Sequence, residues 1–200
     1  MQLNILKMGR KHIPVVLLAT FFTCGMAWGQ TQNAALKTGW EEGPVKWMSF
    51  EQAIEKSKVE KRKIFIDVYT DWCGWCKVMD KNTFSEKEVA KILNEQFYPV
   101  KFDAEQKEDI VFNGTTFKFV PQGNKGYHQL AAALLNNQLA YPTVVFLDEE
   151  FRMIQPLQGY QKAPEFHKII QFIGGDYYKQ TKWEQWQSTY KSPYASGSGQ

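Results

Sequence analysis

Residues 64–76 of the chain are Ile64-Phe65-Ile66-Asp67-Val68-Tyr69, then Thr70-Asp71-Trp72, then Cys73-Gly74-Trp75-Cys76. The first run is apolar apart from one acid, which is typical of a strand covered on both faces in a parallel sheet. Two cysteines separated by two residues follow where such a strand turns into a helix. This sequence, a buried strand followed by two spaced cysteines, predicts a dithiol on the first turn of the helix that follows the strand.

The position of the two thiols predicts how they divide the chemistry. Unpaired backbone N–H groups and the positive end of the helix dipole stabilise a thiolate at a helix start. A free thiol has a pKa of about 8.5, and thiols at comparable sites fall to roughly 3.5–7.5. We therefore predict that Cys73, at the exposed start of the helix, attacks a substrate disulfide, and that the more shielded Cys76 resolves the mixed disulfide.

A zinc site is the alternative for two cysteines at this spacing, because tetrahedral zinc takes four ligands. The third cysteine of the chain is Cys24, in a segment that we expect to be removed. His128 and His167 stand far apart and lack the short spacing of a metal pair. The sequence predicts no metal site and no cofactor.

Several separated motifs give the chain a resemblance to the thioredoxin superfamily. Asp67 matches the buried acid that moves a proton to and from the resolving thiol. Trp72 matches the tryptophan before the first cysteine, and Lys77 the basic residue after the second. Tyr141-Pro142-Thr143 is similar to the cis-proline loop that faces the dithiol, and Gly159 to the glycine after the β-hairpin. The resemblance covers about residues 45–175 and implies an α/β fold with a central mixed sheet flanked by helices.

One branch of the superfamily is especially similar, the branch that includes the C-terminal periplasmic domain of the membrane disulfide reductase. The similar segments are 71–77, Thr83-Phe84-Ser85 and 97–103. The chain departs from ordinary thioredoxin by Trp75, where proline is usual. It also departs by an insertion at about 104–140, which is longer than a crossover helix requires.

The resemblance implies a thiol–disulfide oxidoreductase that acts on protein disulfides or thiols with an unidentified thiol electron donor or acceptor. Reduction is the favoured direction, because the similar branch is reductive. We expect the catalytic residues to be Cys73, Cys76 and Asp67. We expect substrate contacts from five residues, Trp72, Gly74, Trp75, Tyr141 and Pro142. The alternative is a peptide-binding or chaperone module of the same fold without redox turnover.

Asp67 lies within an apolar run, which predicts that its carboxyl is buried without an ion partner below the dithiol. Burial raises the pKa of a carboxyl and suits it to proton exchange with Cys76 near neutral pH. Because a buried unpaired charge is costly, the sequence predicts that Asp67→Asn slows turnover and leaves the fold intact or more stable.

The first 29 residues are typical of a secretory signal peptide. Lys7, Arg10 and Lys11 precede an apolar stretch from Ile13 to Met26, and Ala27-Trp28-Gly29 provides small residues for cleavage after Gly29. A membrane anchor would need about 20 apolar residues. Lipid attachment at Cys24 is an alternative, although Phe21 and Thr23 fit that pattern poorly. We therefore expect a periplasmic or secreted protein with no stable membrane span in the mature chain.

Removal of 29 residues from 200 leaves 171, enough for one well-buried domain. The removed segment carries three positive and no negative charges, so the formal net charge falls from +3 to 0. No basic stripe remains, and nucleic acid is not an expected partner. Without Cys24, only Cys73 and Cys76 remain, and the absence of other disulfides in an exported protein favours a catalytic role for the pair.

The remaining segments predict the elements around this centre. A flexible lead-in spans 30–44, a short edge strand 45–47 and a solvated turn 61–63. Capping boxes begin helices at Ser49 and Ser85. A hairpin joins 144–147 to 151–154, and a helix begins at Pro164 and ends at Gly174-Gly175.

Two further regions lie outside the common fold. The insertion predicts one strand at 115–120 and a helix at about 127–135, with His128 at the surface. It either builds a wall beside the dithiol or extends the sheet. A helical extension spans 176–191, and we expect Trp183, Trp186 and Tyr190 to pack on the domain, with a partner-binding face as the alternative. Residues 192–200 are predicted to be a disordered tail.

Overall fold

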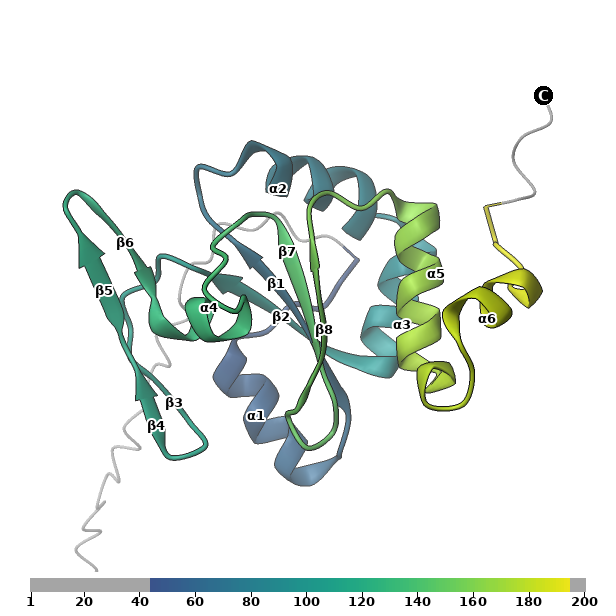
Figure 1. Ribbon diagram of the computed structural model, residues 1–200, viewed down its shortest axis with the longest axis horizontal. Coiled ribbons are helices and arrows are strands. Elements are labelled where there is room, and N and C mark those ends of the chain that lie inside the picture. The colour runs from purple at the N-terminus through teal and green to yellow at the C-terminus, as the bar shows by residue number, and fades with distance from the viewer. Residues whose placement is uncertain (1–43, 195–200) are drawn as a thin grey trace, which may run out of the picture. The chain divides into compact units, whose positions relative to one another are not determined.

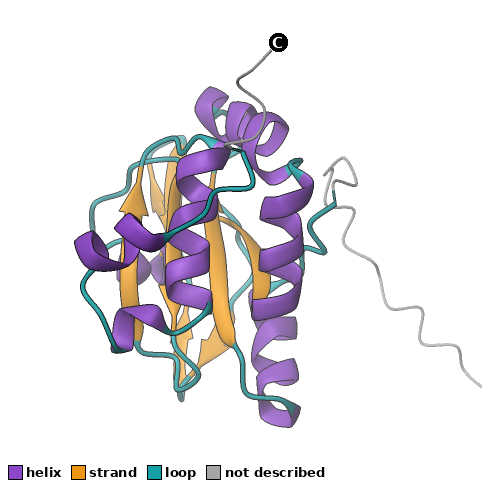
Figure 2. Cartoon of the chain, turned by 90° about the vertical axis from the view of Figure 1, so that its right-hand side faces the viewer, coloured by secondary structure: helices purple, strands orange, loops and turns teal. Residues whose placement is uncertain are grey.

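The computed structural model describes residues 44–194. Its central sheet has four strands in the order β2-β1-β7-β8. Strand β1 (Lys63–Tyr69) pairs in parallel with β2 (Phe97–Asp103) and antiparallel with β7 (Thr143–Leu147), and β8 (Met153–Gln158) pairs antiparallel with β7. The sheet is therefore mixed, and helices cover both of its faces (Figure 1, Figure 2). This arrangement is the predicted thioredoxin-like α/β fold.

Strand β1 lies at the centre of two cores. Ile64, Ile66 and Val68 enter the core that contains residues of α1 (Phe50–Val59) and α4 (Gln129–Leu134). Phe65 enters the other core, with residues of α3 (Lys87–Gln96) and α5 (Ala163–Gly174). All seven residues of β1 are buried. The prediction of a strand covered on both faces is confirmed.

Two predicted capping boxes have different outcomes. At Ser49, the Oγ atom accepts from the Gln52 N–H at 3.2 Å and the Gln52 side chain accepts from the Ser49 N–H at 2.9 Å, so this box is confirmed. The box at Ser85 is wrong. Its hydroxyl donates to the Lys81 carbonyl of a π-helical segment, Asp80–Phe84, and α3 begins after Glu86 without a side-chain cap.

Two expectations near the sheet edge are also corrected. The predicted strand at 45–47 is replaced by a single bridge from Met48 to Val100. Lys63, predicted in a solvated turn, is the buried first residue of β1. Its ammonium lies 2.8 Å from Glu149 and 2.7 Å from Asp176, and these two carboxylates make its burial tolerable.

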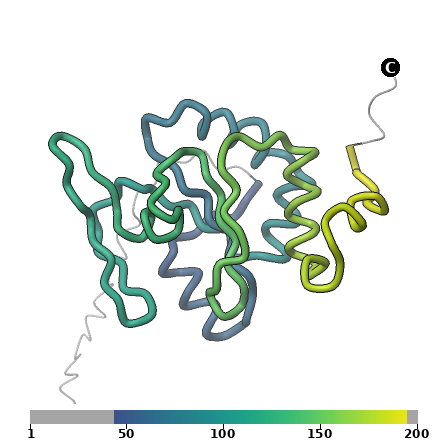
Figure 3. Tube along the Cα trace, viewed as in Figure 1, coloured from purple at the N-terminus to yellow at the C-terminus, as the bar shows by residue number. Residues whose placement is uncertain are grey.

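The insertion folds into two hairpins and a helix (Figure 1, Figure 3). Strands β3 (Ile110–Phe112) and β4 (Thr115–Phe117) form one hairpin, and β5 (Phe119–Gln122) and β6 (Lys125–His128) form the other. Neither hairpin joins the central sheet, so the insertion does not extend it. The single predicted strand at 115–120 is wrong, because the N–H and carbonyl of Lys118 leave the ladder to bond the side chain and N–H of Gln129.

His128 is fully buried, so its predicted surface position is wrong. Tyr127 belongs to β6, and α4 begins only at Gln129. The His128 Nδ1 atom accepts from the Leu130 N–H at 3.2 Å, and Nε2 lies 3.1 Å from the Glu108 carbonyl oxygen. The ring therefore caps α4 and ties it to the start of the insertion.

The last helical elements within residues 44–194 are a short 3₁₀ turn (Tyr177–Lys179) and helix α6 (Trp183–Thr189). The rings of Trp183 and Trp186 each lie 5.1 Å from Phe172 of α5, as predicted for a helix that packs on the domain. Residues 192–194 of the predicted tail are described, and Tyr194 packs edge-on against His167 at 5.7 Å. The rest of that tail, the predicted signal peptide with Cys24, and nearly all of the predicted lead-in lie outside the described residues.

Candidate functional site

Cys73 and Cys76 form a disulfide at the start of α2 (Gly74–Met79), with their Cα atoms 5.3 Å apart. Cys73 is the N-cap residue, and its sulfur accepts from the Cys76 N–H at 3.1 Å. The Cys73 N–H in turn donates to the Thr70 carbonyl at 3.0 Å, just after β1. The predicted placement of the pair, where a buried strand turns into a helix, is confirmed, and the pair supports thiol–disulfide redox chemistry.

Both sulfur atoms lie below the surface in this disulfide form. Cys73 is 5 % exposed and Cys76 3 %, so the predicted difference in exposure is not present. Tyr69 and Tyr141 pack against the pair, and this contact explains the burial of Cys73. Exposed residues next to it include Gly74, Trp72 at 59 % and Trp75 at 62 %.

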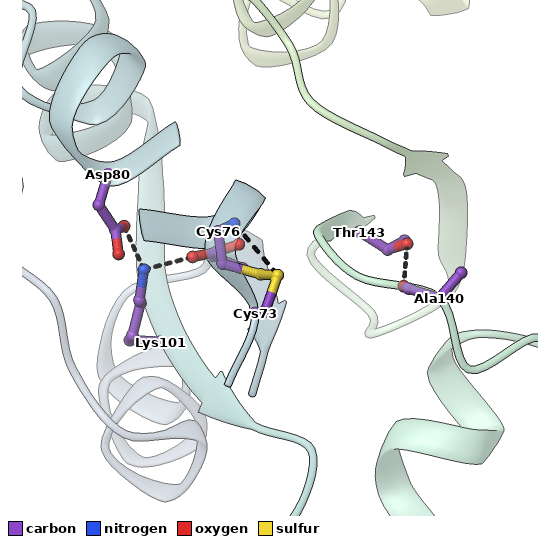
Figure 4. Close-up of a disulfide and its surroundings, with 7 residues drawn as sticks. Cys73, Cys76, Asp80, Lys101, Ala140 and Thr143 are labelled. Atoms are coloured by element: carbon purple, nitrogen blue, oxygen red, sulfur yellow. Dashed lines mark hydrogen bonds and ion pairs between the residues drawn. A yellow bond between two sulfur atoms is a disulfide. The ribbon is translucent and has the colours of Figure 1, made fainter. Parts of the chain in front are cut away.

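The loop before β7 lies on one side of the disulfide (Figure 4). The Tyr141–Pro142 peptide bond is cis, as predicted. The loop is tied to its neighbours by two bonds, from the Thr143 hydroxyl to the Ala140 carbonyl at 2.7 Å and from the Gly159 N–H to the Pro142 carbonyl at 2.8 Å. Gly159 has a φ of 90°, a backbone conformation that glycine adopts at no steric cost.

A buried charge cluster lies on the other side of the disulfide, where Figure 4 shows Lys101 and Asp80. The Lys101 ammonium is 2.5 Å from Asp67 Oδ2 and also donates to Asp80. The side chains of Asp67 and Lys101 are each 2 % exposed, and that of Asp80 is 32 % exposed. Asp67 is buried as predicted, but the expectation that it lacks an ion partner is wrong.

The cluster shifts the pKa values of both buried groups. Burial raises the pKa of Asp67, and the opposing charge of Lys101 does not cancel this effect. Burial alone would lower the pKa of Lys101, but Asp67 and Asp80 outweigh it and the pKa is raised, so Lys101 stays protonated. Asp67 Oδ1 has no hydrogen-bond partner within residues 44–194.

Lys101 and Asp80 are site residues that the sequence did not reveal as such. The sequence signal for Lys101 is its place in the largely apolar run of β2, and the register of β1 and β2 in the structure sets it directly opposite Asp67. Three rings surround its ammonium, with centroids 5.1 Å away for Trp47 and Tyr69 and 5.5 Å for Phe84. Nothing in the sequence marked Asp80 as a site residue, because an acid at this position is also common on the exposed face of a helix.

Of the five predicted substrate contacts, Tyr141 packs against the disulfide, and Pro142 follows it in the same loop. Trp72 and Gly74 flank Cys73 in sequence, and the Trp72 ring packs edge-on against Tyr141 at 5.9 Å. Trp75 packs on Tyr160, with 5.5 Å between ring centroids, and Tyr160 is a neighbour that the sequence did not predict.

No cluster of three or more metal-ligating side chains occurs within the part of the chain that the structure describes. Within that part, no helix is long and apolar enough to span a membrane.

Comparison with known proteins gives partial matches. An uncharacterised protein of Caenorhabditis elegans, B0495.5, is 33 % identical over 85 residues, which are 42 % of this chain and 12 % of that protein. The thiol:disulfide interchange protein DsbD of Colwellia psychrerythraea is 24 % identical over 129 residues, 62 % of this chain and 18 % of DsbD. The matched segments are thus a small part of each relative.

Among solved structures, one described as a DsbH oxidoreductase is 21 % identical, with a TM-score of 0.46 over 64 % of this chain and 82 % of the other. The family model named Thioredox_DsbH, described as a protein of unknown function, DUF255, matches residues 30–189. That match covers most of the sequence and the whole of the site described above. The chain therefore belongs to this thioredoxin-like DsbH family.

Proposed function

We propose that the protein is an exported thiol–disulfide oxidoreductase that exchanges disulfides with protein clients and acts mainly as a reductant. The Cys73–Cys76 disulfide carries this proposal, because it caps a helix beside the loop that contains Pro142. The two sulfur atoms themselves hold the electrons, so the reaction uses no metal or organic cofactor.

In the reductive direction, the Cys73 thiolate attacks one sulfur of a client disulfide, and the other client sulfur leaves as a thiolate and takes a proton. The Cys76 thiol loses its proton and attacks Cys73 in the mixed disulfide, which releases the second client thiol. Two electrons pass to the client, and the enzyme ends in the disulfide form seen here. An external thiol donor must reduce the pair again.

Asp67 is the proposed acceptor and donor of the Cys76 proton. Three observations support this role: its burial, its raised pKa and an Oδ1 atom without a hydrogen-bond partner in the described structure. We expect Asp67→Asn to slow turnover and to change the pH profile of the rate. A profile identical to that of the wild type at every pH would remove Asp67 from the mechanism.

The client chain is proposed to lie between the two tryptophans and the Pro142 loop. Tyr141 packs against the disulfide, and its backbone N–H and carbonyl would pair with an extended client segment as a short added strand. Gly74 is exposed next to Cys73, and a Cβ atom built on it would meet no atom within 4 Å beyond its chain neighbours and its own helix backbone, so the space on this side of Cys73 is open to a client chain. Pro142→Ala is expected to slow the release of mixed disulfides.

The reductive direction and the location are the finer parts of the proposal. The relative DsbD is named a thiol:disulfide interchange protein, and its resemblance to this chain supports interchange chemistry. The residues before Gln30 support export to the periplasm or the medium. Related pairs span about −270 to −120 mV, so a measured potential near the low end would support reduction, and one near the high end would contradict it.

Reduction of insulin disulfides, with dithiothreitol as donor, tests the function directly. We expect the wild type to accelerate the reaction and Cys73→Ser to abolish the acceleration. If the wild type has no effect while it still binds unfolded clients, and Cys73→Ser binds them equally well, the chain is a peptide-binding module and the redox proposal is wrong.

A further inference from the structure

Trp72 is unusually constrained for an exposed side chain. It lies next to the buried Cys73 and is 59 % exposed. Its Nε1–H donates to Glu105 Oε1 at 3.0 Å, and the Lys125 ammonium lies over the ring at 5.4 Å from its centroid. Tyr141 completes these contacts with an edge-on ring. A surface tryptophan is thus held by a hydrogen bond, a cation and a second aromatic ring.

All three partners come from the insertion or its ends. Glu105 follows β2, Lys125 is the first residue of β6, and Tyr141 comes directly after residue 140. The predicted wall beside the dithiol therefore takes a specific form: the insertion contacts the site through Trp72. Trp75, on the same helix start, packs instead on Tyr160, beyond β8.

The hairpin that carries Lys125 is hydrogen-bonded at its base and closely packed within. At its base, the His128 N–H donates to the Ala104 carbonyl at 2.6 Å. Within it, a Cβ atom on Gly126 would lie 2.2 Å from Phe119 Cζ and 2.5 Å from the Val120 carbonyl oxygen, so the strands approach as closely as glycine permits. Lys125 therefore reaches Trp72 from a paired strand of this hairpin.

We propose that Glu105 and Lys125 are positioning residues, which hold the Trp72 indole beside the disulfide as the contact surface for a side chain that flanks the client's reacting cysteine. This inference rests on the proposed function. An indole fixed in advance loses less conformational entropy when a client binds. The exposed ring surface suits an apolar or aromatic client residue, which stacks on an indole with favourable geometry.

The structure supplies matched variants for a test. Lys125→Met removes the charge and keeps an apolar stem, and Glu105→Ala removes the acceptor for the indole N–H. Lys125→Arg and Glu105→Gln restore a cation and an acceptor and should rescue the effect. Lys118→Met is the control, because Lys118 is an exposed lysine of the same insertion that pairs with Asp109 at 2.6 Å.

Steady-state kinetics would use two substrates, a peptide disulfide with phenylalanine next to its cysteine and the small aliphatic hydroxyethyl disulfide. For the peptide, we expect Lys125→Met and Glu105→Ala each to raise KM by about two- to five-fold with little change in kcat. With hydroxyethyl disulfide neither KM nor kcat should change. In a Trp72→Ala background the same substitutions should add nothing, because their effect passes through the indole.

The indole N–H resonance of Trp72, assigned by its loss in Trp72→Phe, provides a readout that does not depend on activity. It should shift in Lys125→Met and Glu105→Ala and stay in place in Lys118→Met. An active wild type whose peptide KM is unchanged by both substitutions, or changed equally in the Trp72→Ala background, would overturn this inference alone. A wild type without disulfide exchange would overturn the proposed function and this inference with it.

Discussion

The two cysteines occupy different positions although both are buried in the disulfide form. Cys73 caps α2 and its sulfur accepts a backbone N–H, whereas Cys76 lies within the first turn. A sulfur that accepts such a bond is stabilised as a thiolate. After reduction, iodoacetamide near pH 7 should modify Cys73 before Cys76, as mass spectrometry would show. Cys76→Ser should trap mixed disulfides with clients and Cys73→Ser should not. A first adduct on Cys76 would reverse the assigned roles.

Lys101 forms ion pairs with two carboxylates, and its replacement gives a prediction with a definite pH dependence. Lys101→Met should lower the free energy of unfolding at pH 8 by about 3–5 kcal/mol, because Asp67 is left as a buried charge without a cation. The pKa of Asp67 is already raised in the folded state and rises further without Lys101. The folded variant therefore binds more protons than the unfolded chain, and the loss shrinks as pH falls.

Urea unfolding at pH 8 and pH 5.5 would measure this difference. Lys58→Met serves as the control, since Lys58 pairs with Glu55 at the surface and its removal should cost less than about 1 kcal/mol at either pH. An equal loss at both pH values in Lys101→Met would show that Asp67 does not take up the proton.

The charge cluster also shows where inference from sequence stops. Asp67 could be placed in a buried strand because it interrupts an apolar run next to a recognisable dithiol. Its partner could not be identified, because the pairing of Lys101 with Asp67 depends on the register between β1 and β2, and 27 residues lie between the end of β1 and the start of β2. Local spacing does not encode that register.

At the scale of elements, strands and helices with strong local signals were predicted, and hydrogen bonds with residues outside the predicted motifs changed the rest. The Ser49 box formed because its two partners are three residues apart. The Ser85 box failed because Lys81 competes for the hydroxyl. The strand predicted at 115–120 broke at Lys118 because Gln129, 11 residues later, binds its backbone.

His128 makes the start of α4 sensitive to pH. Burial lowers the pKa of His128, and its Nδ1 atom must be unprotonated to accept from the Leu130 N–H. Because the folded pKa lies below the ordinary value of about 6.5, the unfolded chain binds more protons below that pH. The stability that His128 contributes is present above about pH 6.5 and is lost as pH falls through and below it.

His128→Asn should remove this dependence, since asparagine caps helices well and does not titrate. The difference in unfolding free energy between wild type and variant, measured with urea at pH 7.5 and pH 5.5, should change by about 1 kcal/mol in favour of the variant at the lower pH. Taking the difference cancels the contributions of His167 and of Asp103, whose pKa burial raises to about 6. Parallel stability curves for the two proteins would contradict the assignment.

Across the whole molecule, the chain places its redox site and its C-terminal extension on different elements. The disulfide lies between β1, α2 and the loop before β7, while α6 packs on α5 at the side away from the insertion (Figure 1, Figure 3). The sequence allowed two roles for the aromatic stripe of α6, packing on the domain or binding a partner. The structure buries Trp186 to 8 % exposure among Phe172, Tyr177 and Tyr190, all within 5.4 Å between ring centroids.

This burial predicts that α6 stabilises the domain without taking part in catalysis. Trp186→Ala should lower the free energy of unfolding by about 3–5 kcal/mol, because the cavity left among three rings cannot close fully. Insulin reduction per folded molecule should stay at the wild-type rate, because the ring contacts of Trp186 in the described structure are with residues outside the disulfide site. Gln187→Ala, at an exposed position of the same helix, should change stability by less than about 0.5 kcal/mol. A small loss in Trp186→Ala, together with slower reduction of protein clients, would instead assign α6 to client binding, because a ring that only fills the domain core has no means of changing the rate at the distant disulfide.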